Sequence, residues 1–338
     1  MKDTATETQH IDIKGNILDR RLSIAPMIEY TDRHCRYLLR LISRYTLLYT
    51  EMVTSGAVIK GDRNYLLAFD ALEHPLALQL GGSNPEELAE AAKIAEQWGY
   101  DEVNLNVGCP SDKVQNGAIG ACLMATPQVV ADCVEHMQQA VNIPVTVKCR
   151  IGIDDQDSYE DLNSFVGTVA GAGCKTFIVH ARKAILQGLS PKQNREIPPL
   201  DYQRVYRLKR DFPGLEIIIN GGITSLTQSV EHLEQVDGVM IGREAYHNPF
   251  VLAEADEWIF GRPSSIATRH EVLNRFIDYI RREMASGTEL KHMAKHTFGM
   301  FHGQPGARRY RRFLSEQIHQ AGAQPEIMEQ ALQLVADS

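Results

Sequence analysis

Eight short apolar runs alternate with segments of helical periodicity, and this alternation constrains the fold more than any other feature of the chain. One intervening segment opens with Asn84-Pro85 and two glutamates and stops at Gly99, which are helix start and stop signals. Strands that alternate with helices pair in parallel. The candidate strands are 22–25, 47–51, 76–80, 102–106, 145–148, 176–180, 216–220 and 238–241.

The number of repeats favours a closed barrel. An open doubly wound sheet would carry a G-x-G-x-x-G turn after its first strand, and none follows 22–25. The pattern changes after residue 260, where the stretch 261–265 indicates a linker and helical periodicity follows. The sequence therefore predicts a polar N-terminal tail over 1–17, a (β/α)8 TIM barrel over 18–260 and a small all-helical domain over 261–338.

Charge is unevenly distributed along the chain. The net charge is −8, yet residues 262–320 hold 11 Lys and Arg against 5 Asp and Glu. A basic segment can bind the phosphates of a nucleic acid even when the rest of the protein is acidic. A solubilising surface with an incidental basic stretch fits the same composition, so charge alone leaves both interpretations open.

Composition disfavours several other classes of protein. No apolar run approaches the roughly 18–20 residues of a membrane span, and the first residues lack the apolar segment of a signal peptide. The six cysteines form no C-x-x-C pair, which indicates free thiols in a reducing compartment. We expect a cytoplasmic protein that has no membrane interaction and no obligate protein partner.

Polar residues and glycines gather where the predicted strands end. In a TIM barrel these ends meet at one mouth, where such barrels bind ligands. Glycines after the seventh and eighth strands expose backbone N–H groups, and an arginine adds a guanidinium, a combination typical of phosphate binding. Turns without a ligand are the alternative for the glycines alone. The set predicts a phosphate-bearing cofactor such as FMN, held by Ala25, Pro26, Met27, Gln79, Lys148, His180, Asn220, Gly221, Gly222, Gly242 and Arg243.

Cys109 differs from the other cysteines because it lies between a glycine and a proline in the loop after the fourth strand. Cys133 and Cys174 are expected to be small buried side chains. A thiol at the barrel mouth can donate a proton, since an ordinary thiol is mostly protonated at neutral pH. A nucleophilic role would require the thiolate instead, and the residues alone do not decide between the two.

A metal site is not expected. His292 and His296 are four residues apart, which can place two imidazoles on one helix face. The H-E-x-x-H motif is absent and no third ligand is evident, so an exposed helix face is the preferred interpretation. The acidic run 154–158 lacks the glycine and terminal glutamate of a calcium loop and is expected to cap a helix.

One set of motifs extends through the whole barrel: Ala25-Pro26-Met27, Asn104-Leu105-Asn106-Val107-Gly108-Cys109-Pro110, Lys148, His180-Ala181-Arg182, Asn220-Gly221-Gly222 and Gly242-Arg243. Together these motifs resemble the tRNA-dihydrouridine synthases. Two further stretches, 188–202 and 303–312, resemble the A subfamily, which acts on position 20/20a in the D-loop of tRNA. The resemblance therefore covers both the barrel and the helical segment.

The resemblance implies an oxidoreductase that uses FMN and NADPH to reduce a uridine of tRNA to 5,6-dihydrouridine. It implies hydride transfer from FMN N5 to C6 of uracil and a proton from Cys109 to C5, with the base extruded from its stack. The subfamily's tRNA-facing positions correspond to Asn106, Lys192, Arg195, Arg308 and Arg311. Asn106 is expected to contact the target nucleotide.

Two other classes of function compete with this one. A flavin barrel acting on a free pyrimidine, as dihydroorotate dehydrogenases do, would reduce the same C5–C6 bond, but a free base has no phosphates for the basic helical segment. A tRNA-binding or RNA-chaperone protein without chemistry would need neither the cofactor residues nor Cys109.

Overall fold

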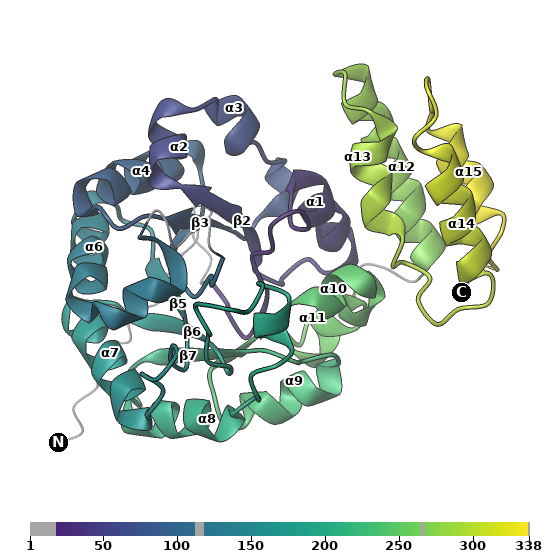
Figure 1. Ribbon diagram of the computed structural model, residues 1–338. Helices are drawn as coiled ribbons and strands as arrows, with labels where there is room; N and C mark the ends of the chain where they lie inside the picture. The colour runs from purple at the N-terminus through teal and green to yellow at the C-terminus, as the bar shows by residue number, and fades with distance from the viewer. Residues whose placement is uncertain (1–17, 112–117, 265–267, 337–338) are drawn as a thin grey trace.

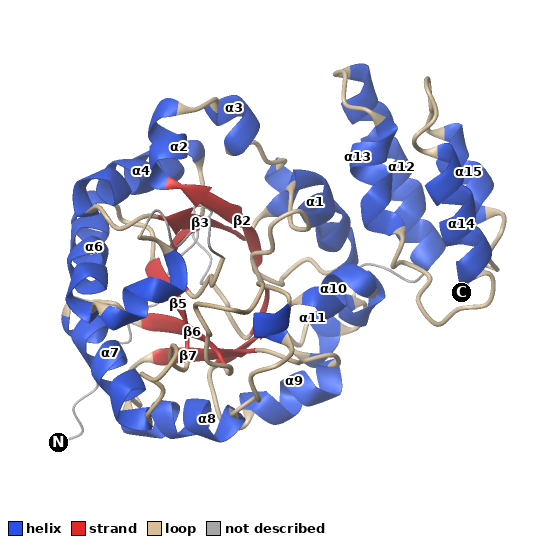
Figure 2. Ribbon diagram, in the orientation of Figure 1, coloured by secondary structure: helices blue, strands red, loops and turns tan. Residues whose placement is uncertain are grey.

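The computed structural model describes residues 18–111, 118–264 and 268–336, so the predicted polar tail lies outside the described residues. Eight parallel strands form one sheet in the order β1-β8-β7-β6-β5-β4-β3-β2. Figure 2 shows the strands in the centre of the barrel, with helices around them. The two ends of the sheet are joined by Leu47, whose carbonyl accepts from Ile24 N at 2.9 Å. The strands are β1 (Leu22–Ile24), β2 (Leu48–Thr54), β3 (Leu76–Gly81), β4 (Glu102–Val107), β5 (Val145–Arg150), β6 (Thr176–His180), β7 (Glu216–Asn220) and β8 (Gly238–Ile241).

Helices surround these strands (Figure 1), and the predicted TIM barrel is confirmed. They are α1 (Arg33–Ile42), α2 (Ser55–Lys60), α3 (Arg63–Leu66), η1 (Ala71–Glu73), α4 (Pro85–Trp98), η2 (Gly120–Ala125), α6 (Pro127–Ala140), α7 (Tyr159–Gly171), η3 (Gln193–Arg195), α8 (Tyr202–Asp211), α9 (Leu226–Leu233), α10 (Arg243–His247), η4 (Pro249–Leu252) and α11 (Ala255–Trp258).

Local signals set the helix ends as the sequence predicts. Asn84 caps α4 through its side chain, and Gly99 ends that helix in the left-handed region with φ 98°. At the end of the acidic run 154–158, Ser158 forms a capping box at the start of α7. These local bonds fix where α4 begins and ends and where α7 begins.

The interior of the barrel has an apolar side and a polar side. Apolar side chains of β2, β3 and β6 to β8 pack together there, with Tyr49 and Met240 among them. The polar side is formed by inward-facing residues of β3, β4 and β5, which alternate with residues of the outer core. Its members are Gln79, Glu102, Asn104, Asn106, Thr146 and Lys148.

A helical domain follows the barrel and lies beside α1 and α10 (Figure 1). Its helices are α12 (Arg269–Ala285), α13 (Leu290–Ala294), η5 (Lys295–Thr297), α14 (Ala307–Gln317) and α15 (Glu326–Leu332). The predicted boundary after residue 260 falls between α11 and α12. Buried residues of both domains belong to one continuous core, so the helical domain is packed against the barrel rather than tethered to it.

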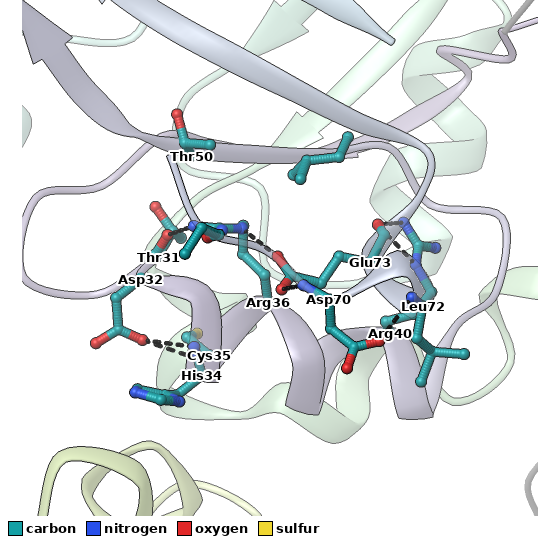
Figure 3. Close-up of polar contacts among 12 residues, drawn as sticks. Thr31, Asp32, His34, Cys35, Arg36, Arg40, Thr50, Asp70, Leu72 and Glu73 are labelled. Atoms are coloured by element: carbon teal, nitrogen blue, oxygen red, sulfur yellow. Dashed lines mark hydrogen bonds and ion pairs between the residues drawn. The ribbon is translucent and has the colours of Figure 1, made fainter. Parts of the chain in front are cut away.

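Asp32 joins the two domains. Its carboxylate accepts from the backbone N–H groups of His34 and Cys35 and so caps α1 (Figure 3). The same carboxylate lies 2.9 Å from His296 Nε2 and 3.1 Å from Lys295 Nζ. The predicted exposed helix face is therefore wrong for His296, which is 1% exposed, because its partner lies 264 residues away in the chain.

α1 is attached to the barrel on one side and to the helical domain on the other. On the barrel side, Arg36 Nε donates to Glu73 at 2.7 Å, and Arg40 donates to the Glu73 carbonyl (Figure 3). On the other side, the Tyr37 ring stacks on Tyr279 with centroids 3.9 Å apart. Because α1 follows the loop that ends β1, the barrel mouth and the helical domain share one positioning element.

Electrostatics favours this attachment at neutral pH. Burial by itself raises the pKa of Asp32, but the hydrogen bond and charge of His296, the N–H of Cys35 and the charge of Lys295 outweigh it and hold the pKa below its ordinary value. A depressed carboxyl pKa stabilises the fold above the unfolded pKa of about 4, and the contribution is lost as the pH falls further.

Replacing Asp32 by alanine should destabilise the protein more than the loss of an ordinary helix cap. The cap itself contributes about 1 kcal/mol, and leaving buried His296 without its carboxylate partner costs about a further 1–3 kcal/mol. Asp62→Ala is the matched control, since Asp62 caps α3 and forms no bond to the helical domain as far as its described residues extend. Thermal unfolding followed by circular dichroism measures both, and equal losses would contradict a role for Asp32 between the domains.

Candidate active site

A cavity of about 600 Å³ opens at the carboxyl ends of the strands, a size typical of small-molecule sites. Every residue that the sequence predicts to hold the cofactor lines this cavity, from Ala25 in the first loop to Arg243 after β8. Cys109, Asn106 and Arg195 line it too. Lys192 is exposed on the loop before Arg195, whereas Arg308 and Arg311 line a separate hollow on the helical domain.

The glycine turn after β7 lies too close to its neighbours for any side chain. Gly221 has φ 118°, and a Cβ there would lie 2.6 Å from His180 Cδ2. Gly222 has φ 72°, and its Cβ would lie 2.6 Å from Leu200 Cδ1. Gly242 differs, because a Cβ would meet no atom within 4 Å and would instead fill cavity space. The glycines thus form a cradle that brings backbone close to a ligand, which fits a bound phosphate.

Arg243 and Glu196 form an ion pair of 2.8 Å at the rim of this cradle. Both side chains are partly exposed, so water screens their attraction. Glu196 belongs to the long loop between β6 and α8, and Arg182 donates to Pro198 of the same loop. The guanidinium of Arg243 is therefore held next to the glycines by a contact weak enough for an anionic ligand to replace.

Lys148 places a half-buried ammonium in the cavity. Its Nζ donates to Asn220 Oδ1 at 3.0 Å, and Asn220 Nδ2 in turn donates to the Met240 carbonyl. Burial and the positive charge of Arg150 lower the pKa of Lys148 to about 8. Within the described part of the chain no carboxylate pairs with Lys148. At neutral pH the site thus holds a cation without a counterion, which favours a ligand that carries or develops negative charge.

His180 is neutral in this environment. Burial, and then the charges of Arg150 and Lys148, hold the pKa of His180 well below its ordinary value. A neutral imidazole can contact a polar ring through one N–H and one acceptor nitrogen. The cavity therefore combines one ammonium, one neutral imidazole and a glycine cradle.

The loop of Cys109 is held from below and from the side. Asn106 Oδ1 accepts from the backbone N–H of Cys109 at 3.0 Å and from that of Gly108 at 3.1 Å. Arg150 Nε donates to the Gly108 carbonyl at 3.0 Å. The Cys109 carbonyl accepts from Ala121 N at 2.9 Å. These contacts place a half-buried thiol at the wall of the cavity.

Sequence patterns missed Arg150, which is 3% exposed and ties the Cys109 loop to the loop before α8 through Asn194 O at 3.0 Å. The predicted strand ended at Lys148, but β5 continues, and residue 150 faces the same side as residue 148. Met52 was missed as well, because a bulge between Tyr49 and Met52 shifts the register of β2.

Four of the other cysteines are buried, unlike Cys109, whereas Cys122 is half-buried as Cys109 is. All six are free, and Cys133 and Cys174 are buried as predicted. Burial raises the pKa of Cys149 and of Cys174 to about 12, which leaves both as inert thiols.

The described residues contain no group of three or more side chains that could hold a metal ion. None of the described helices is long and apolar enough to cross a membrane.

Fold and site together define a TIM-barrel protein with a positively charged cavity at the carboxyl ends of its strands and a thiol in the cavity wall. A solved 2-naphthoyl-CoA reductase has a similar fold, with a TM-score of 0.56 and 12% identity. The match covers 75% of this chain but only 52% of that reductase, and at this identity it shows the fold alone.

The dihydrouridine synthase model matches residues 23–336, and the chain belongs to that family. A tRNA-dihydrouridine(20/20a) synthase of Escherichia coli O6:H1 is 62% identical over 94% of this chain and 96% of the relative. Synthases of the same name from Vibrio cholerae and Shewanella oneidensis are 60% and 58% identical over 92% and 96% of this chain, and the matches cover 95% and 98% of those relatives. The resemblance drawn from the motifs is confirmed. The family consists of flavin-dependent oxidoreductases that reduce uridine to dihydrouridine in tRNA.

Flavin binding should depend on the charge of Lys148. Because its pKa is about 8, the affinity for the flavin should fall as the pH rises through 8, by up to about tenfold per pH unit, since only the protonated amine attracts negative charge on the ligand. Lys148→Met should bind the flavin weakly and without this dependence. Quenching of flavin fluorescence between pH 6.5 and 9 measures the affinity. The control is Lys175→Met, which removes an exposed amine just before β6; a wild-type profile that stays flat would exclude the role of Lys148.

Proposed function

We propose that this chain reduces uridine 20 or 20a in the D-loop of tRNA, with FMN as cofactor, NADPH as electron donor and Cys109 as proton donor. The observation that carries the proposal is the thiol of Cys109, whose backbone loop is held by Asn106 and Arg150 at the wall of a cavity with a half-buried ammonium and a glycine cradle. The name shared by relatives at 58–62% identity supports the tRNA position.

The cavity residues fit FMN in two parts. Gly221, Gly222, Gly242 and Arg243 would hold the phosphate, because backbone N–H groups and a guanidinium bind such an anion. Lys148 and His180 would lie along the ring, where the ammonium stabilises negative charge. When bound, FMN supplies the hydride that reduces C6 of uracil. Ala25, Pro26, Met27 and Gln79 would form the remaining wall.

Cys109 would complete the reaction by giving its proton to C5 of the uracil ring. General acids act through a positioned proton within hydrogen-bond reach of the reacting atom. The loop contacts of Cys109 supply that positioning, because its N–H and its carbonyl are both bonded to protein groups. Asn106 keeps one amide hydrogen beyond its bond to Gln79, and this hydrogen would contact the uracil.

Arginines of the helical domain would bind the tRNA backbone while the target base enters the cavity. Arg308 and Arg309 are exposed on α14 and Arg311 is half-exposed, and within the described residues none of the three forms an ion pair. Lys192 and Arg195 would extend this positive surface to the mouth, where Arg195 Nε is buried and no described residue accepts its hydrogen bond. Extrusion of the base costs a few kcal/mol of stacking, which contacts to the phosphates offset.

Cys109→Ala should separate the two half-reactions. NADPH should still reduce the bound flavin, because that step needs no proton from the thiol. Reoxidation of the flavin by tRNA should slow by about 100-fold or more, since a positioned general acid contributes about 10²–10⁴-fold. Rapid mixing with absorbance detection measures each step. Free uridine in place of tRNA tests the alternative of a free pyrimidine substrate, and reoxidation by tRNA at the wild-type rate in Cys109→Ala would refute the proton-donor role.

Arg308→Ala and Arg311→Ala should weaken tRNA binding and leave FMN binding unchanged. Each lost phosphate contact should lower the slope of log affinity against log salt concentration by about 1. Filter binding across a salt series measures this slope. Arg207→Ala is the control, since it removes the same charge from α8, where Arg207 lies over the Tyr159 ring. Equal effects of all three variants would indicate a general loss of charge rather than a binding surface.

A further inference from the structure

A chain of buried hydrogen bonds runs through the polar side of the barrel and begins at a carboxylate deep in its interior. Glu102 is 0% exposed and accepts from Arg20 Nε at 2.7 Å and from the Tyr49 hydroxyl at 2.6 Å. The Thr146 hydroxyl donates to the same carboxylate at 2.7 Å. The ion pair with Arg20 compensates the buried charge, so Glu102 is a fixed acceptor.

The chain continues upward through three amide side chains. Asn104 Nδ2 donates to Thr146 Oγ1 at 2.9 Å, and Gln79 Nε2 donates to Asn104 Oδ1 at 2.7 Å. Asn106 Nδ2 donates to Gln79 Oε1 at 2.7 Å. The last acceptor, Asn106 Oδ1, receives the N–H groups of Gly108 and Cys109. Thr146 is 1% exposed and Asn104 0%, so water does not compete for these bonds.

The carboxylate sets the direction of the whole chain. A carboxylate only accepts, so the Thr146 hydroxyl must donate to Glu102 and has only its lone pairs left for Asn104. Each amide then donates downward and accepts from above. If the amides were reversed, the NH₂ group of Asn106 would face two backbone N–H groups, and the Cys109 loop would lose both bonds. The carboxylate below and the two backbone N–H groups above therefore require the same direction, and Glu102 supports the orientation of Asn106 from four side chains away.

We propose that Thr146, acting from Glu102 through Asn104, Gln79 and Asn106, is a positioning residue for Cys109. Neither Thr146 nor Glu102 lines the cavity, so their effect on the reaction passes through the amides. The inference rests on the proposed role of Cys109 as proton donor. In a purely structural role, the Thr146 hydroxyl would satisfy buried polar groups and affect stability alone.

The test is Thr146→Val, which keeps the shape of the side chain and removes the hydroxyl, alongside Thr146→Ser, which restores it. Thr146→Val should reduce flavin by NADPH at the wild-type rate and bind tRNA with unchanged affinity. Its reoxidation by tRNA should slow by about 100-fold, because a misplacement near 1 Å costs that much. Thr146→Ser should recover most of this rate.

Thr176→Val is the matched control. Thr176 is equally buried, and its hydroxyl donates to Glu216, the second carboxylate bound by Arg20, at 2.8 Å. Thr176 reaches Glu102 indirectly, through Glu216 and Arg20, and its hydroxyl is not one of the groups between Glu102 and Cys109. Its loss should therefore lower the melting temperature and leave reoxidation by tRNA unchanged. Equal slowing in Thr146→Val and Thr176→Val would overturn the positioning role.

A double-mutant cycle separates this inference from the proposed function. If the chain acts through Cys109, Thr146→Val should add no further slowing in a Cys109→Ala background, and additive losses would overturn it. If Cys109→Ala alone leaves reoxidation intact, the proposed function fails instead. Glu102→Gln is the second variant if Thr146→Val does not fold. It should show the same selective slowing, because an amide no longer imposes the direction of the hydrogen-bond chain. A wild-type rate of reoxidation by tRNA in Glu102→Gln would count against the proposal.

Discussion

Closure of the sheet is the constraint on which the rest of this structure depends. The bonds between Leu47 and β1 turn eight parallel strands into a ring, and a ring of parallel strands has all its carboxyl ends on one side. Residues as distant in sequence as Ala25 and Arg243 therefore meet around one cavity. In an open sheet the same side chains would be spread along an edge and would not form an enclosed site.

Electrostatics gives the cavity its chemical character. Burial, and then the positive charges of Arg150 and Lys148, lower the pKa of His180, so this imidazole is neutral. The buried carboxylate Glu102 lies at the opposite end of the interior and is paired with Arg20. The positive charge at the mouth attracts anionic ligands. The buried charge of Glu102 is neutralised by Arg20, so the barrel interior holds no unpaired carboxylate there.

The sequence predicted those features that depend on local pattern. Eight strands followed from β-branched apolar runs, and the cavity lining followed from the rule that polar residues at strand ends converge. The sequence did not predict features that depend on contacts between residues far apart in the chain. The partner of His296 is Asp32, in the other domain, and Arg150 lies beyond the predicted end of its strand. The path from Glu102 to Asn106 alternates among three strands, so no single segment shows it. The tRNA-facing roles of Lys192 and Arg195 rest on family resemblance rather than on geometry.

The loop from β1 into α1 has a consequence for how enzymes of this shape diversify. Met27 forms part of the cavity wall, and Asp32, five residues later, is bound to the helical domain. A substitution that tilts the helical domain must therefore move a segment that also shapes the cofactor site. Substitutions in the cavity wall and in the contact between Asp32 and the helical domain are therefore coupled through one short peptide. We expect a change in substrate binding to need compensating substitutions on both sides of α1.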